Sequence, residues 1–285
     1  MKILFDASQC GIGNNGGSKT IVRSADTLVA MGHDVTIQTP VWRYTWSQHS
    51  CKVWPFPTVP SVRYDLAVAV SAQDVEHCLK VNAGKHVWWV RGWETWNYSE
   101  EALYDKVKKI DVVGNSGWLG NHLDCPVCFA GFDSWDSGGV RRAFAVGYLY
   151  HNRHKTKQSE WAQDIIKQSG LNYIALNSRD NLDYEGLRKL YGSCKMWLAS
   201  SVLEGFHQVP AEANLCGCLV LSNTDFRNGM GDYATDETAM QYRNASEAIE
   251  AMLNPDYSKV EKMQERLREI GSREKCMAHF LEVVA

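Results

Sequence analysis

Two glutamates, Glu204 and Glu212, stand eight positions apart in the stretch Glu-Gly-Phe-His-Gln-Val-Pro-Ala-Glu. This stretch lies between two apolar runs, 196–199 and 218–221, and each run predicts a buried strand. Pro210 suits the first turn of a helix, because the amide hydrogen that proline lacks would be unpaired there. Glu212 is then expected in the same turn, near free backbone amides and the positive end of the helix dipole.

A strand, a turn with free amides and a helix N-terminus together form a site that favours anions. Carboxylates beside such a site accept hydrogen bonds from hydroxyl groups. The combination therefore suits a ligand that carries both phosphate and sugar, such as a nucleotide sugar. The alternative interpretation is a helix with one capping glutamate and one solvated glutamate, without a ligand.

Strand-like and helix-like segments alternate along the chain, which is typical of parallel α/β sheets. We expect strands at 2–6, 35–38, 66–70, 86–90 and 112–113, then at 144–150, 173–176, 195–199, 218–221 and 239–242. Helices are expected at 18–31, from 258 to 270 and after Gly271. Apolar strands without alternation indicate sheets that are buried on both faces. The sequence thus predicts two doubly wound α/β domains that meet near Ser137-Gly-Gly139.

Several further segments match a known pattern in the same order along the chain. They are Gly32–Thr36, Asp111–Ser116, Gly131–Asp133, Gly147–Tyr150 and Leu190-Tyr191. Together with Glu204-x7-Glu212, they resemble the group 1 (family 4) retaining glycosyltransferases, over most of the chain. The resemblance implies the GT-B fold, with two Rossmann-like domains facing a cleft. The expected bounds are 1–140 for an acceptor-side domain, 141–265 for a nucleotide-sugar domain, and 266–285 for a C-terminal helix packing back on the first domain.

The resemblance also implies roles for the residues of the Glu-x7-Glu segment. In that family the first glutamate lies by the donor sugar and the second holds the nucleotide ribose. We therefore expect Glu204 to be catalytic and Glu212 to bind the donor, with Gly205, Phe206 and His207 beside it. His207 replaces a glycine that is common in the family. Retention of configuration is implied by the resemblance alone.

Cationic side chains are expected to stabilise the departing diphosphate, where negative charge builds up. In the family an arginine and a lysine follow the first strand of the second domain. Here Tyr148 occupies the usual place of the arginine, Lys155 best matches the lysine, and Arg153 is the substitute for the arginine. The run 137–159 contains no acidic residue and the chain contains no Asp-x-Asp element. We therefore expect no metal and no cofactor beyond a UDP- or GDP-linked sugar as co-substrate.

The first domain offers a second set of candidates. Arg91 stands where the family usually has a histidine near the donor sugar. Glu94 is close enough in sequence to act on the acceptor hydroxyl, although a glutamate that starts a helix is an equally good interpretation. Gly16 and Gly17 resemble the interdomain loop of the family, where the backbone approaches the donor phosphate or the acceptor.

A rival interpretation comes from Gly11-x-Gly13-x-x-Gly16, which matches the dinucleotide-binding fingerprint after a first strand. Such a site needs an acid at the end of the second strand to hold the ribose. The corresponding residues, Gln38-Thr39-Pro40, include none. A dinucleotide-dependent oxidoreductase therefore stays a weaker alternative, and a non-catalytic sugar-binding protein is another. The presence of Glu204, Glu212 and Lys155 argues against a non-catalytic protein.

Composition limits the partners. The formal net charge of −3 argues against a strongly basic nucleic-acid binder. No run approaches the roughly 18 apolar residues of a membrane span, so we expect no integral membrane association. The nine cysteines suggest reduced thiols in the cytoplasm. Cys125-x-x-Cys128 has zinc-like spacing, but a second such pair is missing from the sequence.

The acceptor is left open by the sequence among a saccharide, a small metabolite and a hydroxymethylated base in viral DNA. Of the 11 tryptophans, most lie in the first half of the chain. Some must belong to the core, but such an excess also fits a face that stacks on sugars or bases. An enzyme acting on a DNA base would have to extract that base and hold it by stacking.

Overall fold

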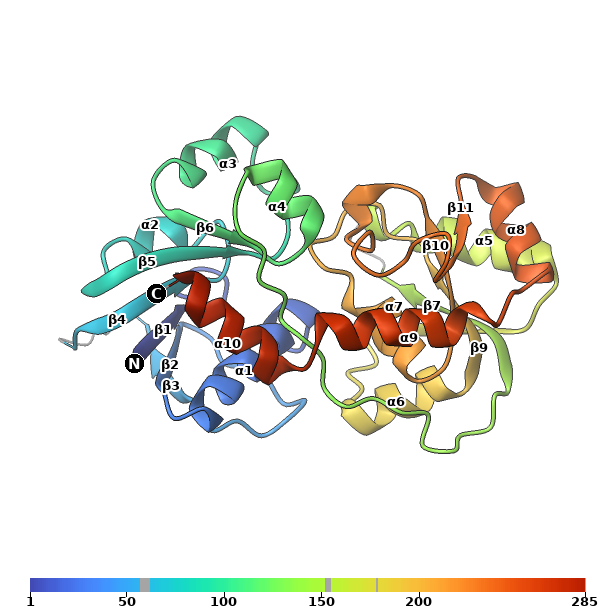
Figure 1. Ribbon diagram of the computed structural model, residues 1–285, viewed down its shortest axis with the longest axis horizontal. Coiled ribbons are helices and arrows are strands. Elements are labelled where there is room, and N and C mark those ends of the chain that lie inside the picture. Colours follow the sequence, from blue (N-terminus) through green and yellow to red (C-terminus); the bar gives the residue numbers. More distant parts are fainter. Residues whose placement is uncertain (57–61, 152–154, 178, 285) are drawn as a thin grey trace. The chain divides into compact units, whose positions relative to one another are not determined.

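The computed structural model describes residues 1–56, 62–151, 155–177 and 179–284 (Figure 1). They form two compact units: Met1–Gly131 with Arg273–Ala285, and Phe132–Ser272. Each unit holds one parallel sheet with helices on both faces. The predicted fold class, two doubly wound α/β domains, is therefore confirmed.

The sheet of the first unit has six parallel strands. Their order is β3 (Lys52–Pro55), β2 (Asp34–Thr39), β1 (Lys2–Asp6), β4 (Tyr64–Ala69), β5 (Ala83–Val90) and β6 (Asp111–Gly114). The helices are α1 (Gly16–Ala30), α2 (Val75–Cys78), α3 (Glu100–Val107), α4 (Gly117–Leu123) and α10 (Arg273–Val284). Helices α1 and α10 pack together, and the ring of Phe280 on α10 lies 5.1 Å from that of Trp89 on β5.

The sheet of the second unit has five parallel strands. Their order is β11 (Met240–Tyr242), β10 (Leu219–Asn223), β9 (Cys194–Ala199), β7 (Phe144–Tyr150) and β8 (Tyr173–Asn177). The helices are α5 (Ser159–Ser169), α6 (Tyr184–Gly192), α7 (Gln208–Leu215), α8 (Ala245–Leu253) and α9 (Lys259–Ile270). Two short 3₁₀ turns, η1 (Lys155–Lys157) and η2 (Phe226–Asn228), follow β7 and β10.

Side chains of β9 alternate between the two faces of this sheet, as the pleat of a strand requires. Met196 and Leu198 join a buried cluster with residues of α5 and α8. Trp197 faces the other way and packs with Leu187 of α6 and Ala213 of α7. Because helices cover both faces of the sheet, residues 196–199 of β9 are all apolar. This continuous apolar run is why the strand could be predicted from the sequence.

The unit boundaries differ from those expected from the sequence. Trp135 stacks on Tyr184 and packs against Tyr191, so the segment after Gly131 belongs to the second unit. The expected break at Ser137-Gly-Gly139 is a turn within that unit, where both glycines have positive φ. Near the other end, 266–285 is not one helix. Gly271, with φ of +107°, separates α9 from α10, and only α10 belongs to the first unit.

Among the described residues, no helix combines the length and the apolar character that a bilayer crossing needs.

Candidate functional site

The order of the strands in the second unit marks a place for a ligand. The chain runs from β7 to β8 on one side, then returns to β9 on the other side of β7. A place where consecutive strands continue on opposite sides of one strand is called a topological switch point. In open α/β sheets, ligands bind at such a switch point, outside the carboxyl ends of the strands. The residues that follow Tyr150 of β7 and Ala199 of β9 are therefore the first to consider.

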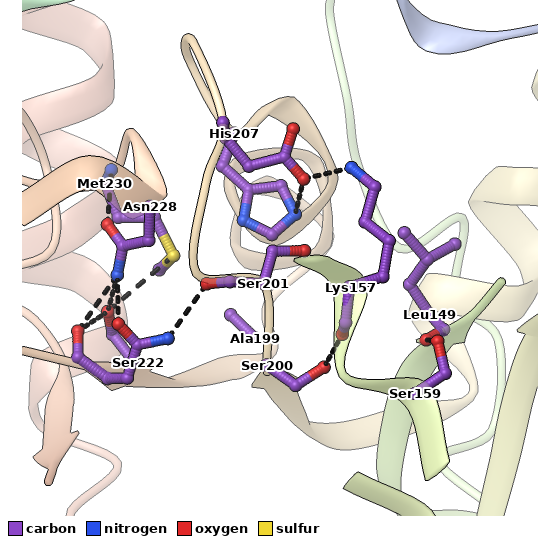
Figure 2. Close-up of polar contacts among 12 residues, drawn as sticks. Leu149, Lys157, Ser159, Ala199, Ser200, Ser201, His207, Ser222, Asn228 and Met230 are labelled. Atoms are coloured by element: carbon purple, nitrogen blue, oxygen red, sulfur yellow. Dashed lines mark hydrogen bonds and ion pairs between the residues drawn. The ribbon is translucent and has the colours of Figure 1, made fainter. Parts of the chain in front are cut away.

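An ion pair joins the segments that follow these two strands. The ammonium group of Lys157, at the end of η1, contacts a carboxylate oxygen of Glu204 (Figure 2). The backbones beside the pair are also joined. Ser200 donates its hydroxyl to the Lys157 carbonyl at 2.7 Å, and the amide of Val202 donates to the Thr156 carbonyl at 2.9 Å. Lys157 is thus held at the switch point by its backbone as well as by its charge.

The ionisation of Glu204 depends on opposing effects. Burial by itself raises the pKa of this carboxyl group. The charge of Lys157, together with hydrogen bonds from Lys157 and Ser201, outweighs burial and holds the pKa below its ordinary value. Glu204 is therefore a carboxylate at neutral pH, and its partner is an ammonium group that carries three hydrogen-bond donors.

The loop from Glu204 to His207 is fixed by a second loop. The amide of Glu204 donates to the Arg227 carbonyl at 2.8 Å, and that of His207 donates to the Gly229 carbonyl at 3.3 Å. Gly229 has a φ of +72°, and a Cβ there would overlap the Gly205 carbonyl. Phe206 packs its ring against Phe132 and Tyr233 in the core. Gly205 and Phe206 thus shape the loop, whatever they contribute to a ligand.

Glu212 lies on α7, but two positions further into the helix than expected. The first turn of α7 contains no acidic residue, so the sequence-based placement of Glu212 there is wrong. The helix begins at Gln208, which places Pro210, as expected, in the first turn and Glu212 beyond it. The carboxyl group of Glu212 is 1% exposed and accepts a hydrogen bond from the Tyr191 hydroxyl at 3.3 Å. Its role in holding a ribose stays a prediction.

The lysine expected at the site was Lys155, and the structure instead brings Lys157 to Glu204. Both residues belong to η1, where Lys155 is exposed. The turn ends at Gln158, whose φ of +48° is uncommon for a residue other than glycine and leads directly into α5. This change of direction is not visible in the sequence, which offers two equivalent lysines. Arg153, the other expected cation, lies outside the described residues.

The candidates of the first unit gather at the carboxyl end of its own sheet. The guanidinium group of Arg91 donates to the carbonyl groups of Gly17 and Val70. Glu94 accepts a hydrogen bond from the amide of Ala72 at 3.0 Å, and burial raises the pKa of its carboxyl group. Arg91 and Glu94 therefore hold the loops that follow β1 and β4.

The glycine-rich loop leads directly into α1. Gly16 and Gly17 are exposed and form the first residues of the helix, which Asn15 caps by accepting from the Ser18 amide at 2.8 Å. Strand β2 ends at Thr39 after Gln38, and both side chains are buried. The acid that a dinucleotide site would need at this strand end is therefore not supplied by β2.

The cysteines offer no ligand set. All nine are free thiols, and burial raises the pKa of Cys128 to about 12. Among the described residues, no group of three or more His, Cys, Asp or Glu side chains could hold a metal ion.

Comparison with solved structures identifies the fold. Sucrose-phosphate synthase from Thermosynechococcus elongatus matches 99% of this chain and 98% of its own, with a TM-score of 0.74 and 12% sequence identity. HepE of Anabaena, in complex with UDP and glucose, matches 99% of this chain and 98% of its own (TM-score 0.70, 14% identity). A glycosyltransferase from Rickettsia africae matches 99% and 97% (TM-score 0.65, 13% identity). No protein-family model and no curated protein matches the sequence.

These likenesses extend over both units and define the chain as a protein of the GT-B fold. The fold expected from the resemblance is thus confirmed. At 12–14% identity the likeness concerns the fold, so the chemistry must be argued from the residues of the site.

Proposed function

We propose that this protein is a glycosyltransferase that moves a sugar from a nucleotide-sugar donor to an acceptor hydroxyl group. The observation that carries the proposal is the Lys157–Glu204 ion pair at the switch point of the second unit. A cation at this place suits the diphosphate of a donor, and carboxylates nearby suit its hydroxyl groups. Support comes from the structural neighbours, which include a glycosyltransferase and a protein bound to UDP and glucose.

Lys157 is proposed to stabilise the negative charge that develops on the departing diphosphate. Its three donors allow it to contact a phosphate oxygen while it still contacts Glu204. Glu204 holds this ammonium group in place through their ion pair. Lys155 and Arg153 remain candidates for further contacts to phosphate, because both belong to the same basic segment.

We further propose that transfer proceeds with retention and without a metal ion. Retention rests on the resemblance to the retaining family. Metal independence is supported by the lysine at the site, by the lack of an Asp-x-Asp element in the sequence, and by the lack of a ligand cluster among the described residues. The nucleotide is proposed to be UDP or GDP, with Glu212 at the ribose.

For the acceptor, we propose a hydroxyl group of a saccharide or a small metabolite. The formal net charge of −3 favours such an acceptor over a polyanion. Transfer to a hydroxymethylated DNA base is the alternative with the same chemistry. The Gly11–Gly16 loop, with Gln38 and Thr39 at the end of β2, does not favour an oxidoreductase.

The test is a donor screen followed by an acceptor screen. Thermal shift with a panel of UDP- and GDP-sugars identifies the donor that stabilises the protein most. Mass spectrometry then detects sugar transfer from this donor to oligosaccharides, to small hydroxylated metabolites and to duplex DNA with hydroxymethylated bases. A protein that neither binds nor consumes any nucleotide sugar in the panel would refute the proposal.

A further inference from the structure

His207 is a buried histidine whose ring lies beside Glu204 without a hydrogen bond to it. Its side chain is 6% exposed, and both ring nitrogens lack a hydrogen-bond partner among the described residues. The nearest carboxylate oxygen, on Glu204, lies 3.7 Å from Nε2, beyond hydrogen-bond distance (Figure 2). Buried polar groups in native proteins are almost always paired, because an unpaired group loses its hydration without compensation. The missing partner is therefore expected to come from outside the chain.

The backbone of His207 is held in place. Its amide donates to the Gly229 carbonyl, and its carbonyl accepts the hydroxyl of the buried Tyr233. The residue caps the N-terminus of α7, so its backbone also fixes the start of that helix. The ring is consequently presented from a fixed backbone beside the Lys157–Glu204 pair, as expected of a preformed recognition element.

The ring is neutral under ordinary conditions. Burial lowers the pKa of His207 to about 4, and the charge of Lys157 adds to this effect while Glu204 opposes it. A neutral imidazole offers one donor and one acceptor. It has no charge to attract phosphate, a role that Lys157 can fill. It is matched instead by hydroxyl groups, which both donate and accept.

We infer that His207 recognises hydroxyl groups of the transferred sugar and so determines which donor is accepted. The inference rests on the proposed function. It assigns two parts of the donor molecule to two neighbouring side chains. Lys157 takes the charged diphosphate, and His207 takes the neutral sugar. A sugar hydroxyl group can accept a hydrogen bond from the protonated ring nitrogen or donate one to the other nitrogen.

Two substitutions separate recognition from packing. His207→Gln keeps one hydrogen-bond donor and one acceptor, whereas His207→Leu removes both. Since the ring nitrogens of the ligand-free protein are unpaired, His207→Leu should unfold at the same temperature as the wild type or higher. A residue with a purely structural hydrogen-bonding role would give the opposite result, a lower unfolding temperature that His207→Gln restores.

The experiment is titration calorimetry of the intact protein with UDP, with GDP, and with the UDP- or GDP-sugar that ranks first in the donor screen. We expect His207→Leu to weaken binding of the nucleotide sugar about tenfold or more, while binding of the free nucleotide changes less than about twofold. His207→Gln should keep at least part of the sugar-dependent affinity. A deoxy sugar that lacks the recognised hydroxyl should bind the wild type and His207→Leu equally.

Three results would overturn the inference. The first is unchanged binding of the nucleotide sugar by His207→Leu. This result would mean that the ring nitrogens form hydrogen bonds with water and not with the sugar. The second is an equal loss for nucleotide and nucleotide sugar, and the third is the lowered unfolding temperature described above. Failure of the proposed function has a different signature, because the wild type itself would then bind no nucleotide sugar.

Discussion

Lys157 and Glu204 are 47 residues apart in the sequence, yet their side chains form an ion pair where two neighbouring strands end. The pair is produced by topology: β7 and β9 are adjacent and parallel, so the segments after them emerge side by side. A carboxylate and an ammonium group are thereby placed where ligands of α/β sheets bind. The predictions below begin with this pair.

The first prediction concerns the choice between two lysines. Lys157→Ala should lower kcat by about 10²–10³, the usual loss when one donor to developing negative charge is removed. Lys155→Ala is the matched comparison, because it removes an equal charge from an exposed position on the same turn, and we expect it to cause the smaller loss. Steady-state kinetics with the identified donor measure both. If Lys155→Ala carries the larger defect, the sequence-based choice of Lys155 is correct and our reading of the ion pair is wrong.

The second prediction separates the two glutamates. Glu212→Ala should weaken nucleotide binding by about 1–3 kcal/mol, as expected for the loss of a charge-assisted hydrogen bond. Glu204→Ala should instead reduce turnover and leave the affinity for free nucleotide nearly unchanged. Calorimetry with UDP or GDP measures the first effect, and donor turnover the second. Equal nucleotide affinity in Glu212→Ala and the wild type would remove Glu212 from the donor site.

The third prediction tests the support of the Glu204–His207 loop. Gly229→Ala places a Cβ against the Gly205 carbonyl, at a φ of +72° that disfavours alanine. We expect Gly229→Ala to lower both the unfolding temperature and donor affinity. Gly231→Ala provides the control, since a Cβ there meets nothing within 4 Å. Two variants that behave alike would show that the contact between the loops does not matter.

The fourth prediction concerns pH. The pKa of His207 falls from 6.5 in the unfolded chain to about 4 in the folded protein. Between these values the unfolded chain binds a proton that the folded protein does not, so the free energy of unfolding decreases as pH falls through this range. At about 1.4 kcal/mol for each pKa unit, the loss amounts to about 3 kcal/mol.

His207→Leu removes this titration. Urea denaturation of both proteins between pH 7 and pH 4 should show the variant gaining stability relative to the wild type as pH falls. Glu204 is present in both proteins, and the stability that its lowered pKa provides starts to be lost only as pH falls to about its ordinary pKa of 4.5, near the end of this range. Stability curves that stay parallel across the range would contradict the assignment of a neutral, buried His207.

Much of the fold could be predicted because the strands are buried on both faces. The run 144–150 coincides with β7, and 195–199 lies within β9. Strand β3 was missed, since Lys52–Pro55 is a short edge strand whose residues are mostly exposed and form no apolar run. Local patterns thus revealed the apolar strands, including the edge strands β6, β8 and β11, but not this exposed one.

The site was predictable only in part. Glu204 and His207 stand out in the sequence because their segment follows a strand and precedes a helix. Lys157 could not be separated from Lys155, because both lie in the same short turn and the tertiary contacts of that turn with Ser200 and Val202 have no signal in the sequence. The position of Glu212 was missed by two residues because α7 begins at Gln208 rather than at Pro210.

Glycosyl transfer is measured directly by the release of nucleotide from the donor. The wild type is incubated with the donor that ranks first in the thermal-shift screen, with and without EDTA, and UDP or GDP is quantified together with the mass of any glycosylated acceptor. We expect release that is coupled to transfer, undiminished by EDTA, and strongly reduced in Lys157→Ala although that variant stays folded. Release that EDTA abolishes and Mn²⁺ or Mg²⁺ restores would contradict the proposed cationic mechanism. The absence of release with every donor would contradict the proposed activity itself.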